Sequence, residues 1–227
     1  MTLTPVQEDA WLVIPLYEEG RVVEEVLREA RAVFPHVVCV DDASRDDSAD
    51  RARAAGAVVV QHPFNLGQGA ALQTGMRYVL QATDAAYLVT FDADGQHRPQ
   101  DAAEMVQRAR DEHLAVVFGS RFLDRRTRPG LVKKLVLKAA VWLTNQQTGM
   151  KLTDAHNGLR VIRRDAAARL DLRQNRMAHA TEIVLQLGRT GLPWAEHPVH
   201  VLYTDYSRAK GQSLMNSVNI LVDTILK

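Results

Sequence analysis

The chain has 227 residues, the length of one ordinary domain, and its 28 Lys and Arg residues nearly balance its 27 Asp and Glu residues. The formal net charge of +1 excludes a sequence-independent nucleic-acid binder, and a hydrophobic content of 46% excludes a disordered chain. One cysteine, Cys39, excludes an internal disulfide framework and favours a reducing compartment. Because the sequence has no long apolar run and no signal-peptide pattern, we expect a soluble cytoplasmic protein.

The first half of the chain alternates short apolar runs with segments of helical periodicity. The apolar runs predict strands at 11–15, 37–40, 57–60, 86–91 and 115–119. Apolar residues at helical spacing predict helices between them at 19–34, 46–55, 67–81 and 99–112. This alternation predicts an α/β fold with a mostly parallel sheet flanked by helices, in which ligands bind at the carboxyl ends of the strands.

The second half is less regular. Helices are predicted at 131–146, at 178–189 and near the C-terminus, and a strand at 194–203. The amphipathic helix at 131–146 has two interpretations. It packs on the sheet, or it lies on an anionic membrane surface with its lysines facing the headgroups. These lysines are Lys133, Lys134 and Lys138.

The strongest local signal is the acidic stretch that directly follows the strand at 86–91. Asp92 and Asp94 stand one residue apart there, and Gln96 follows. Two such carboxylates can share a hard divalent cation, Mg²⁺ or Mn²⁺, which still has positions for phosphate oxygens. The alternative is a solvated acidic turn. A preceding strand and a helix beginning at Pro99 favour a metal and nucleotide site.

Asp41 and Asp42 end a second strand, so they fall on the same edge of the predicted sheet. Their carboxylates can hydrogen-bond a base or a ribose. The following helix also needs a cap, for which Ser44 and Asp46 are candidates. Both interpretations can hold together.

A glycine-rich turn at 65–71 opens the next helix, with Asn65 as a candidate cap. It has the first two glycines of a dinucleotide-binding turn, but Leu72 stands where the third would be. No Gly-Lys-Ser or Gly-Lys-Thr follows, so the turn is not a phosphate-binding P-loop either. The sequence therefore argues against both a nicotinamide enzyme and a P-loop ATPase.

Several stretches follow one another along nearly the whole chain, at 14–19, 40–44, 65–71, 91–97, 119–122, 153–160 and 206–213. The first two are Ile-Pro-Leu-Tyr-Glu-Glu and Val-Asp-Asp-Ala-Ser. Phe-Asp-Ala-Asp-Gly-Gln-His and Gly-Ser-Arg-Phe come later in the series. In this order and spacing the stretches resemble a family-2 glycosyltransferase, and among this family they most resemble the polyprenyl (dolichyl) phosphate mannosyl- or glucosyltransferases.

The resemblance implies a GT-A fold in one domain, 1–227, with a nucleotide-sugar-binding half at 1–122 and an acceptor-side half at 123–227. It implies metal-dependent transfer of a hexose, with inversion, from a GDP- or UDP-linked sugar, using Mg²⁺ or Mn²⁺. The acceptor is a polyprenyl phosphate, or alternatively a saccharide hydroxyl. Contact with a membrane surface or an integral membrane partner is also implied. A sugar-1-phosphate nucleotidyltransferase and an inert sugar-nucleotide-binding subunit are the rival functions.

The resemblance also implies site residues, position by position. The nucleoside and donor side takes Pro15, Tyr17, Glu19, Asp41, Asp42 and Gly67. The metal and diphosphate side takes Asp92, Asp94 and Gln96. The implied phosphate contacts are Arg121, Arg208, Lys210 and Ser213, and the forked guanidinium donors of the two arginines suit oxyanions.

The acceptor decides whether a general base is needed. A phosphate acceptor needs none, whereas a hydroxyl needs one, for which Asp154 and Glu182 are candidates. Asp94, Arg121, Asp154 and Glu182 form the implied catalytic set. The alternative for Arg121, Arg208, Asp154 and Glu182 is a role in structural ion pairs.

Some positions depart from the family's usual pattern. Glu18 stands where Asn is usual and Ala43 where Gly is usual, and we expect both to be tolerated. The lysines of the 131–146 helix replace an Arg and a Ser that the subgroup has four residues apart. Leu214 replaces a lysine that often follows Ser213. The last two departures bear on the acceptor rather than the donor.

Overall fold

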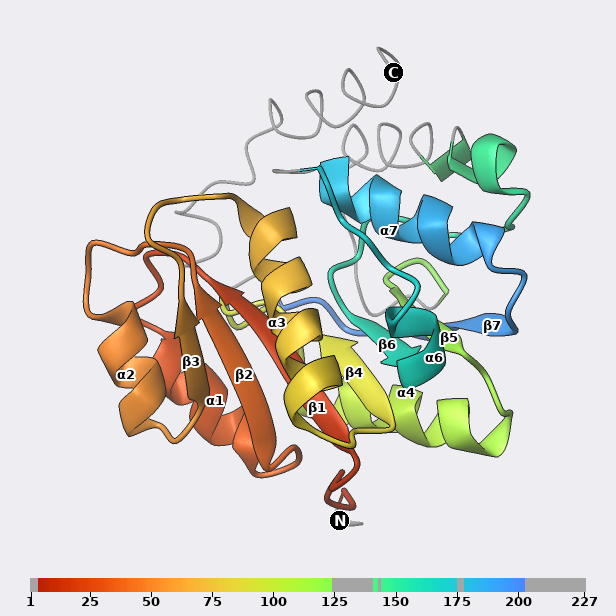
Figure 1. Ribbon diagram of the computed structural model, residues 1–227. Coiled ribbons are helices and arrows are strands. Elements are labelled where there is room, and N and C mark those ends of the chain that lie inside the picture. The colour runs from red at the N-terminus through yellow and green to blue at the C-terminus, as the bar shows by residue number, and fades with distance from the viewer. Residues whose placement is uncertain (1–3, 124–140, 143, 175–177, 203–227) are drawn as a thin grey trace.

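The computed structural model describes residues 4–123, 141–142, 144–174 and 178–202. Arg208, Lys210, Ser213 and the three lysines of the predicted 131–146 helix lie outside these residues. The described part contains a seven-stranded sheet with the order β3-β2-β1-β4-β6-β5-β7 (Figure 1). The strands are β1 (Ala10–Leu16), β2 (His36–Asp41), β3 (Val58–Gln61), β4 (Tyr87–Thr90), β5 (Val116–Ser120), β6 (Arg160–Arg163) and β7 (Trp194–Pro198).

All strand pairs are parallel except the two that β6 makes, with β4 and β5. The predicted α/β class with a mostly parallel sheet is therefore confirmed. The five strands of the first half form where apolar runs predict them, and β7 begins as predicted but ends at Pro198. The strand β6 was not predicted, because only Val161 and Ile162 separate its terminal arginines.

Helices cover both faces of the sheet and enclose two hydrophobic clusters. One cluster packs Leu12 and Ile14 of β1 against two helices that hold Leu27 and Met105, and the other packs Val13 against helices on the opposite face. The first face carries α1 (Val23–Arg31), α2 (Ser48–Ala54) and α4 (Pro99–Asp111). The second carries α3 (Gln68–Ala82), α6 (Arg164–Ala167) and α7 (Ala178–Arg189). No helix in the described residues is both long and apolar enough to cross a bilayer.

Two local predictions about the helices need correction. Helix α1 begins at Val23, not at 19, because the carbonyl of Glu19 closes a turn by accepting the N–H groups of residues 22 and 23. Asn65 does not cap α3. Its amide donates to the carbonyl of Asp42, at 3.3 Å, and Gly67 occupies the cap position instead. Both changes leave loop residues at the carboxyl edge of the sheet.

Cys39 lies in the middle of β2 and is fully buried. Burial, with a smaller contribution from the nearby Asp41, raises the pKa of its thiol to about 12. The prediction of a buried, unreactive thiol agrees with this environment.

Candidate functional site

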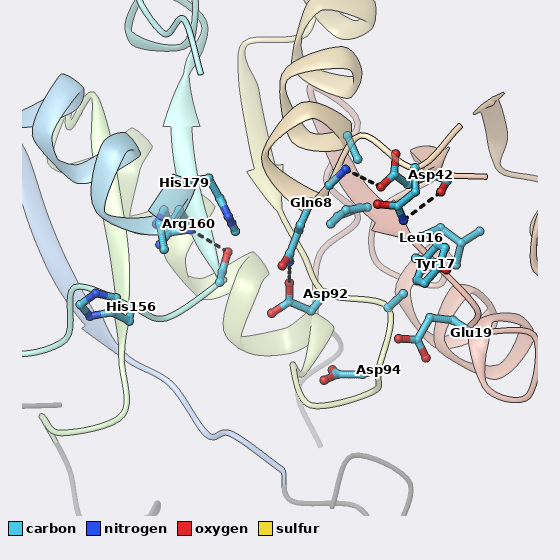
Figure 2. Close-up of a pocket in the computed structure, with 17 residues that line it drawn as sticks. Leu16, Tyr17, Glu19, Asp42, Gln68, Asp92, Asp94, His156, Arg160 and His179 are labelled. Carbon is cyan, nitrogen blue, oxygen red and sulfur yellow. Dashed lines mark hydrogen bonds between the residues drawn. The ribbon is translucent and has the colours of Figure 1, made fainter. Parts of the chain in front are cut away.

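A cavity of about 430 Å³ opens at the carboxyl ends of β1, β2 and β4 (Figure 2). Its lining comes from the loops after these strands, from the start of α3, from the segment before β6 and from α7. The lining residues are Pro15, Leu16, Tyr17, Glu19, Asp42, Asn65, Gly67, Gln68, Ala71, Asp92, Ala93, Asp94, His156, Gly158, Arg160, His179 and Ala180. This is the edge of the sheet where the sequence places the ligand.

Asp92 lies in the centre of the cavity in Figure 2 and is held by two side chains. Nε2 of His97 lies 2.9 Å from its Oδ2, and the amide of Gln68 donates to its Oδ1 at 3.3 Å. Burial alone would raise the pKa of Asp92, but the hydrogen bond and charge of His97, together with Arg160 and His179, lower it overall. Asp92 is therefore ionised at neutral pH.

Asp94 faces the same cavity in a more negative environment. Gln96 binds it twice, through its backbone N–H at 3.0 Å and its side-chain amide at 2.6 Å. Burial, then the charge of Asp92, raises the pKa of Asp94 to about 6. Gln96 does not line the cavity, so in this structure it orients Asp94 instead of facing a ligand.

These carboxylates fit a divalent cation that shares its ligands with a substrate. The described residues hold no group of three or more His, Cys, Asp or Glu that could bind an ion unaided. Mg²⁺ and similar ions are commonly held by one or two carboxylates together with substrate phosphates and water. Burial and the charge of Asp92 together raise the pKa of Asp94, and a bound cation would favour the ionised form of both carboxylates.

The segment after β1 forms one end of the cavity. Pro15, Tyr17 and Glu19 all line it, and the side chain of Tyr17 is 40% exposed. The backbone N–H of Glu19 donates to Oγ of Ser48 at 2.8 Å, which ties this loop to the start of α2. The loop thus presents an aromatic ring and a carboxylate on a fixed backbone.

Asp42 lines the cavity, but its carboxylate already accepts several hydrogen bonds. The backbone N–H groups of Leu66 and Gly67 donate to it at 2.8 and 2.7 Å, and Nδ1 of His62 lies 2.8 Å away. Gly67 has a positive φ of 93°, and its hydrogen bond to Asp42 holds this backbone conformation in place. Asp41 does not line the cavity, and its oxygens bind the N–H of residue 44 and the amide of residue 61.

The opposite wall of the cavity is basic. None of its residues was predicted as a site residue, although His156 and Arg160 fall in the 153–160 stretch of the resemblance. Arg160 and His179 lie on this side of Figure 2, with Asp92 between them and Glu19. Burial lowers the pKa of Arg160 to about 10, so it stays cationic, and lowers that of His156 to about 4, so it stays neutral. The one sequence signal that could have revealed this wall is Arg160, an arginine directly before the apolar residues Val161 and Ile162.

Arg121 and Asp154 form a buried ion pair away from the cavity lining. Nε of Arg121 lies 2.6 Å from Oδ2 of Asp154, and its backbone N–H donates to the same oxygen at 3.2 Å. Glu196 accepts the backbone N–H groups of Thr153 and Asp154, which fixes the pair. Asp154 therefore orients Arg121 in this structure and does not face the cavity.

Glu182 also lies outside the cavity lining. Its carboxylate accepts the backbone N–H groups of Arg173 and Gln174, the latter at 2.9 Å, and the amide of Gln186 at 3.2 Å. These bonds tie the preceding loop to α7. Its hydrogen bonds within the described residues therefore support a structural role, and none of them directs it into the cavity.

An α/β sheet with a carboxylate-lined cavity at its strand ends is the arrangement of GT-A glycosyltransferases, and solved structures match it. Glucosyl-3-phosphoglycerate synthase from Mycobacterium tuberculosis, in complex with phosphoglyceric acid, superposes with a TM-score of 0.68 at 20% identity. The match covers 95% of this chain and 78% of that one. The model of Glycosyl transferase family 2 matches residues 11–171. The chain belongs to this family, which confirms the resemblance found in the sequence.

Relatives extend along most of the chain. An uncharacterized protein of Methanocaldococcus jannaschii is 30% identical over 97% of this chain and 93% of its own length. The UDP-N-acetylglucosamine–dolichyl-phosphate N-acetylglucosaminyltransferase of Methanococcus voltae is 27% identical over 90% of each chain. The undecaprenyl-phosphate 4-deoxy-4-formamido-L-arabinose transferase of Shewanella sediminis is 26% identical over 94% of this chain and 65% of its own length. The family thus includes transferases named for polyprenyl phosphates.

Proposed function

We propose that this glycosyltransferase moves a sugar from a nucleoside-diphosphate-sugar to a polyprenyl phosphate, with inversion at the anomeric carbon and with Mg²⁺ or Mn²⁺. The observation that carries the proposal is the pair Asp92 and Asp94, which faces a cavity at the carboxyl edge of a GT-A sheet. Two relatives named for dolichyl and undecaprenyl phosphate support the class of acceptor. A sugar-1-phosphate nucleotidyltransferase is disfavoured, because the loop after β1 is acidic.

The donor occupies the cavity from the β1 side. Tyr17 offers a partly exposed ring to the base, and Glu19 and Pro15 border it. Gly67, held by Asp42, brings backbone close to the ligand without a side chain in the way. A solved structure of the mycobacterial synthase contains Mn²⁺ and uridine diphosphate, which supports a uracil nucleotide as the first donor to test.

Asp92 and Asp94 would hold the divalent cation, which when bound neutralises charge on the diphosphate leaving group. The chain keeps these ligands ready. His97 keeps Asp92 ionised through the 2.9 Å contact, and Gln96 fixes the orientation of Asp94 through two hydrogen bonds. Preorganised charges of this kind cost no reorganisation during the reaction.

A phosphate acceptor agrees with the places of the two candidate general bases. Asp154 and Glu182 do not line the cavity, and both accept hydrogen bonds elsewhere. A phosphate monoester is already an anion at neutral pH and attacks without losing a proton to the protein. Attack from the face opposite the diphosphate inverts the anomeric carbon. Roles for Arg121 and for Arg208, Lys210 and Ser213 at the phosphates remain sequence-based proposals, as does contact with a membrane surface or an integral membrane partner.

The test pairs nucleotide binding with sugar transfer. UDP and GDP should be titrated calorimetrically with and without Mn²⁺, and we expect one of them to bind only with the metal. Asp94→Asn should lower transfer to an isoprenyl phosphate by at least about 100-fold, as losses of charge-stabilising groups do. Asp84→Asn, which changes an exposed carboxylate outside the cavity, should leave transfer unchanged. Full activity of Asp94→Asn, or a retained anomer by NMR, would refute the proposal.

A further inference from the structure

The segment 156–160, of which His156, Gly158 and Arg160 line the cavity, gathers hydrogen-bonding atoms that have no partner in the described part of the chain. Six buried side-chain polar atoms lack a partner there, and four of them belong to residues 156–160. They are Nδ1 of His156, Nδ2 of Asn157, and Nε and Nη2 of Arg160. Native proteins leave few buried polar groups unsatisfied, so this concentration marks a place where a ligand completes the hydrogen bonds.

Arg160 sets the charge of that ligand. Its side chain is fully buried, and its one hydrogen bond among the described residues is a long one, 3.5 Å from Nη1 to the carbonyl of Gly158. No carboxylate of the described residues lies within ion-pair distance of it, whereas the equally buried Arg121 is paired with Asp154. A buried, unpaired guanidinium is costly unless an anion joins it. An oxyanion with several acceptor oxygens fits both the charge and the forked donors.

The position of Arg160 distinguishes this subsite from the donor side. Arg160 is the one arginine or lysine among the described residues that line the cavity, and the opposite side carries Glu19, Asp94 and Asp92. The two sides meet where Asp92 packs on Gly158. A Cβ added to Gly158 would lie 2.2 Å from Oδ2 of Asp92, so the contact requires glycine. An anion that arrives without its own metal is repelled by the acidic side and attracted by Arg160.

We propose that Arg160, with His156 on the same wall of the cavity, binds the phosphate oxygens of the acceptor. This inference rests on the proposed function, because it assigns the acceptor of that reaction to the basic wall. The donor diphosphate enters the acidic side together with a divalent cation, whereas a phosphate monoester depends on a fixed cation of the protein. The other source of an oxyanion at this wall is the carboxylate of an acidic donor sugar.

Binding measurements with soluble ligands test the assignment directly. The ligands are a ten-carbon isoprenyl monophosphate and the matching alcohol. We expect the wild type to bind the phosphate at least about tenfold more tightly than the alcohol, the effect of one charged hydrogen-bonded contact. Arg160→Gln should lose this preference and keep its affinity for UDP or GDP with Mn²⁺. Arg163→Gln changes an arginine at the other end of β6 that pairs with Asp165, and it should behave as the wild type.

Arg160→Lys is a second variant for the case that Arg160→Gln does not fold, because it keeps the positive charge but loses the forked guanidinium donors. We expect its preference for phosphate over alcohol to fall below that of the wild type, and an unchanged preference in either variant overturns the assignment. An equal loss of nucleotide affinity in Arg160→Gln would place the residue at the diphosphate instead. A preference of the wild type for UDP-glucuronate over UDP-glucose that Arg160→Gln removes would assign it to the sugar.

Failure of the proposed function has a different signature. In that case neither UDP nor GDP binds the wild type in the presence of Mn²⁺, whatever happens at Arg160. A wild type that binds the nucleotide but does not distinguish isoprenyl phosphate from its alcohol overturns only the inference about Arg160.

Discussion

Ala43 holds a backbone conformation that favours glycine, and its replacement by glycine should stabilise the protein. Its φ is 61°, in the left-handed region, directly after the cavity residue Asp42. This is also a position where the family usually has glycine. An L-residue in this region carries a steric cost of about 1–2 kcal/mol, which glycine does not. Glycine loses about 0.5–1 kcal/mol more conformational entropy on folding. The net gain for Ala43→Gly is therefore about 0.75 kcal/mol at the midpoints of these ranges, within about 0–1.5 kcal/mol.

Thermal and urea unfolding measure this gain. For a chain of this size each kcal/mol raises the Tm by about 2–4 °C, so the midpoint gain for Ala43→Gly should raise it by about 1.5–3 °C. Ala54→Gly is the matched control. Ala54 is exposed at the C-terminal end of the helix α2, where glycine relieves no strain and its extra conformational entropy in the unfolded chain should lower the Tm slightly. The two substitutions share their chemistry and differ in sign only because of φ. A loss of stability in Ala43→Gly similar to that of Ala54→Gly would refute the reasoning.

Three further predictions follow from individual contacts. The thiol of Cys39, buried with a pKa of about 12, should react with a disulfide reagent at pH 8 only as fast as the protein unfolds, and rapid labelling of the native state would contradict its burial. Gly158→Ala should weaken Mn²⁺-dependent nucleotide binding by at least about tenfold in calorimetry, because the new Cβ displaces Asp92. Asp42→Ala should cost about 2–4 kcal/mol in urea unfolding, because it leaves backbone N–H groups of the next loop unpaired. The surface variant Asp50→Ala should cost under about 1 kcal/mol.

The sequence predicts the donor side of this fold well because its signals are local. Each of the first five strands is an apolar run between polar segments, and the carboxyl ends of parallel strands meet at one edge whatever the loops do. Tyr17, Asp42 and the pair Asp92 and Asp94 therefore reach one cavity from the ends of β1, β2 and β4. Their hydrogen-bond partners are not local signals. Nothing in the sequence shows that the carboxylate of Asp42 accepts hydrogen bonds from the backbone of the loop after β3.

The wall of the cavity that carries Arg160 depends on tertiary contacts that sequence patterns do not contain. The strand β6 runs antiparallel between β4 and β5, and these neighbours bury Arg160 beside the cavity. A four-residue segment with an arginine at each end predicts an exposed turn rather than a central strand. Glu182 shows the converse. Its type and position in the chain suggested chemistry, but the fold places it against the loop before α7, where it accepts backbone N–H groups.

The proposed function brings two anionic substrates into one cavity whose walls carry opposite charges. A diphosphate and a phosphate monoester repel each other, so each would need a cation of its own. On the proposed donor side this would be a metal ion held by Asp92 and Asp94, and on the proposed acceptor side it would be Arg160. That fixed cation must stay charged when buried. Burial lowers the pKa of Arg160 to about 10, so the guanidinium stays charged at neutral pH, whereas a lysine starts from a lower pKa of about 10.4 and would keep less of its charge in the same place. Arginine is therefore the residue that this wall can use.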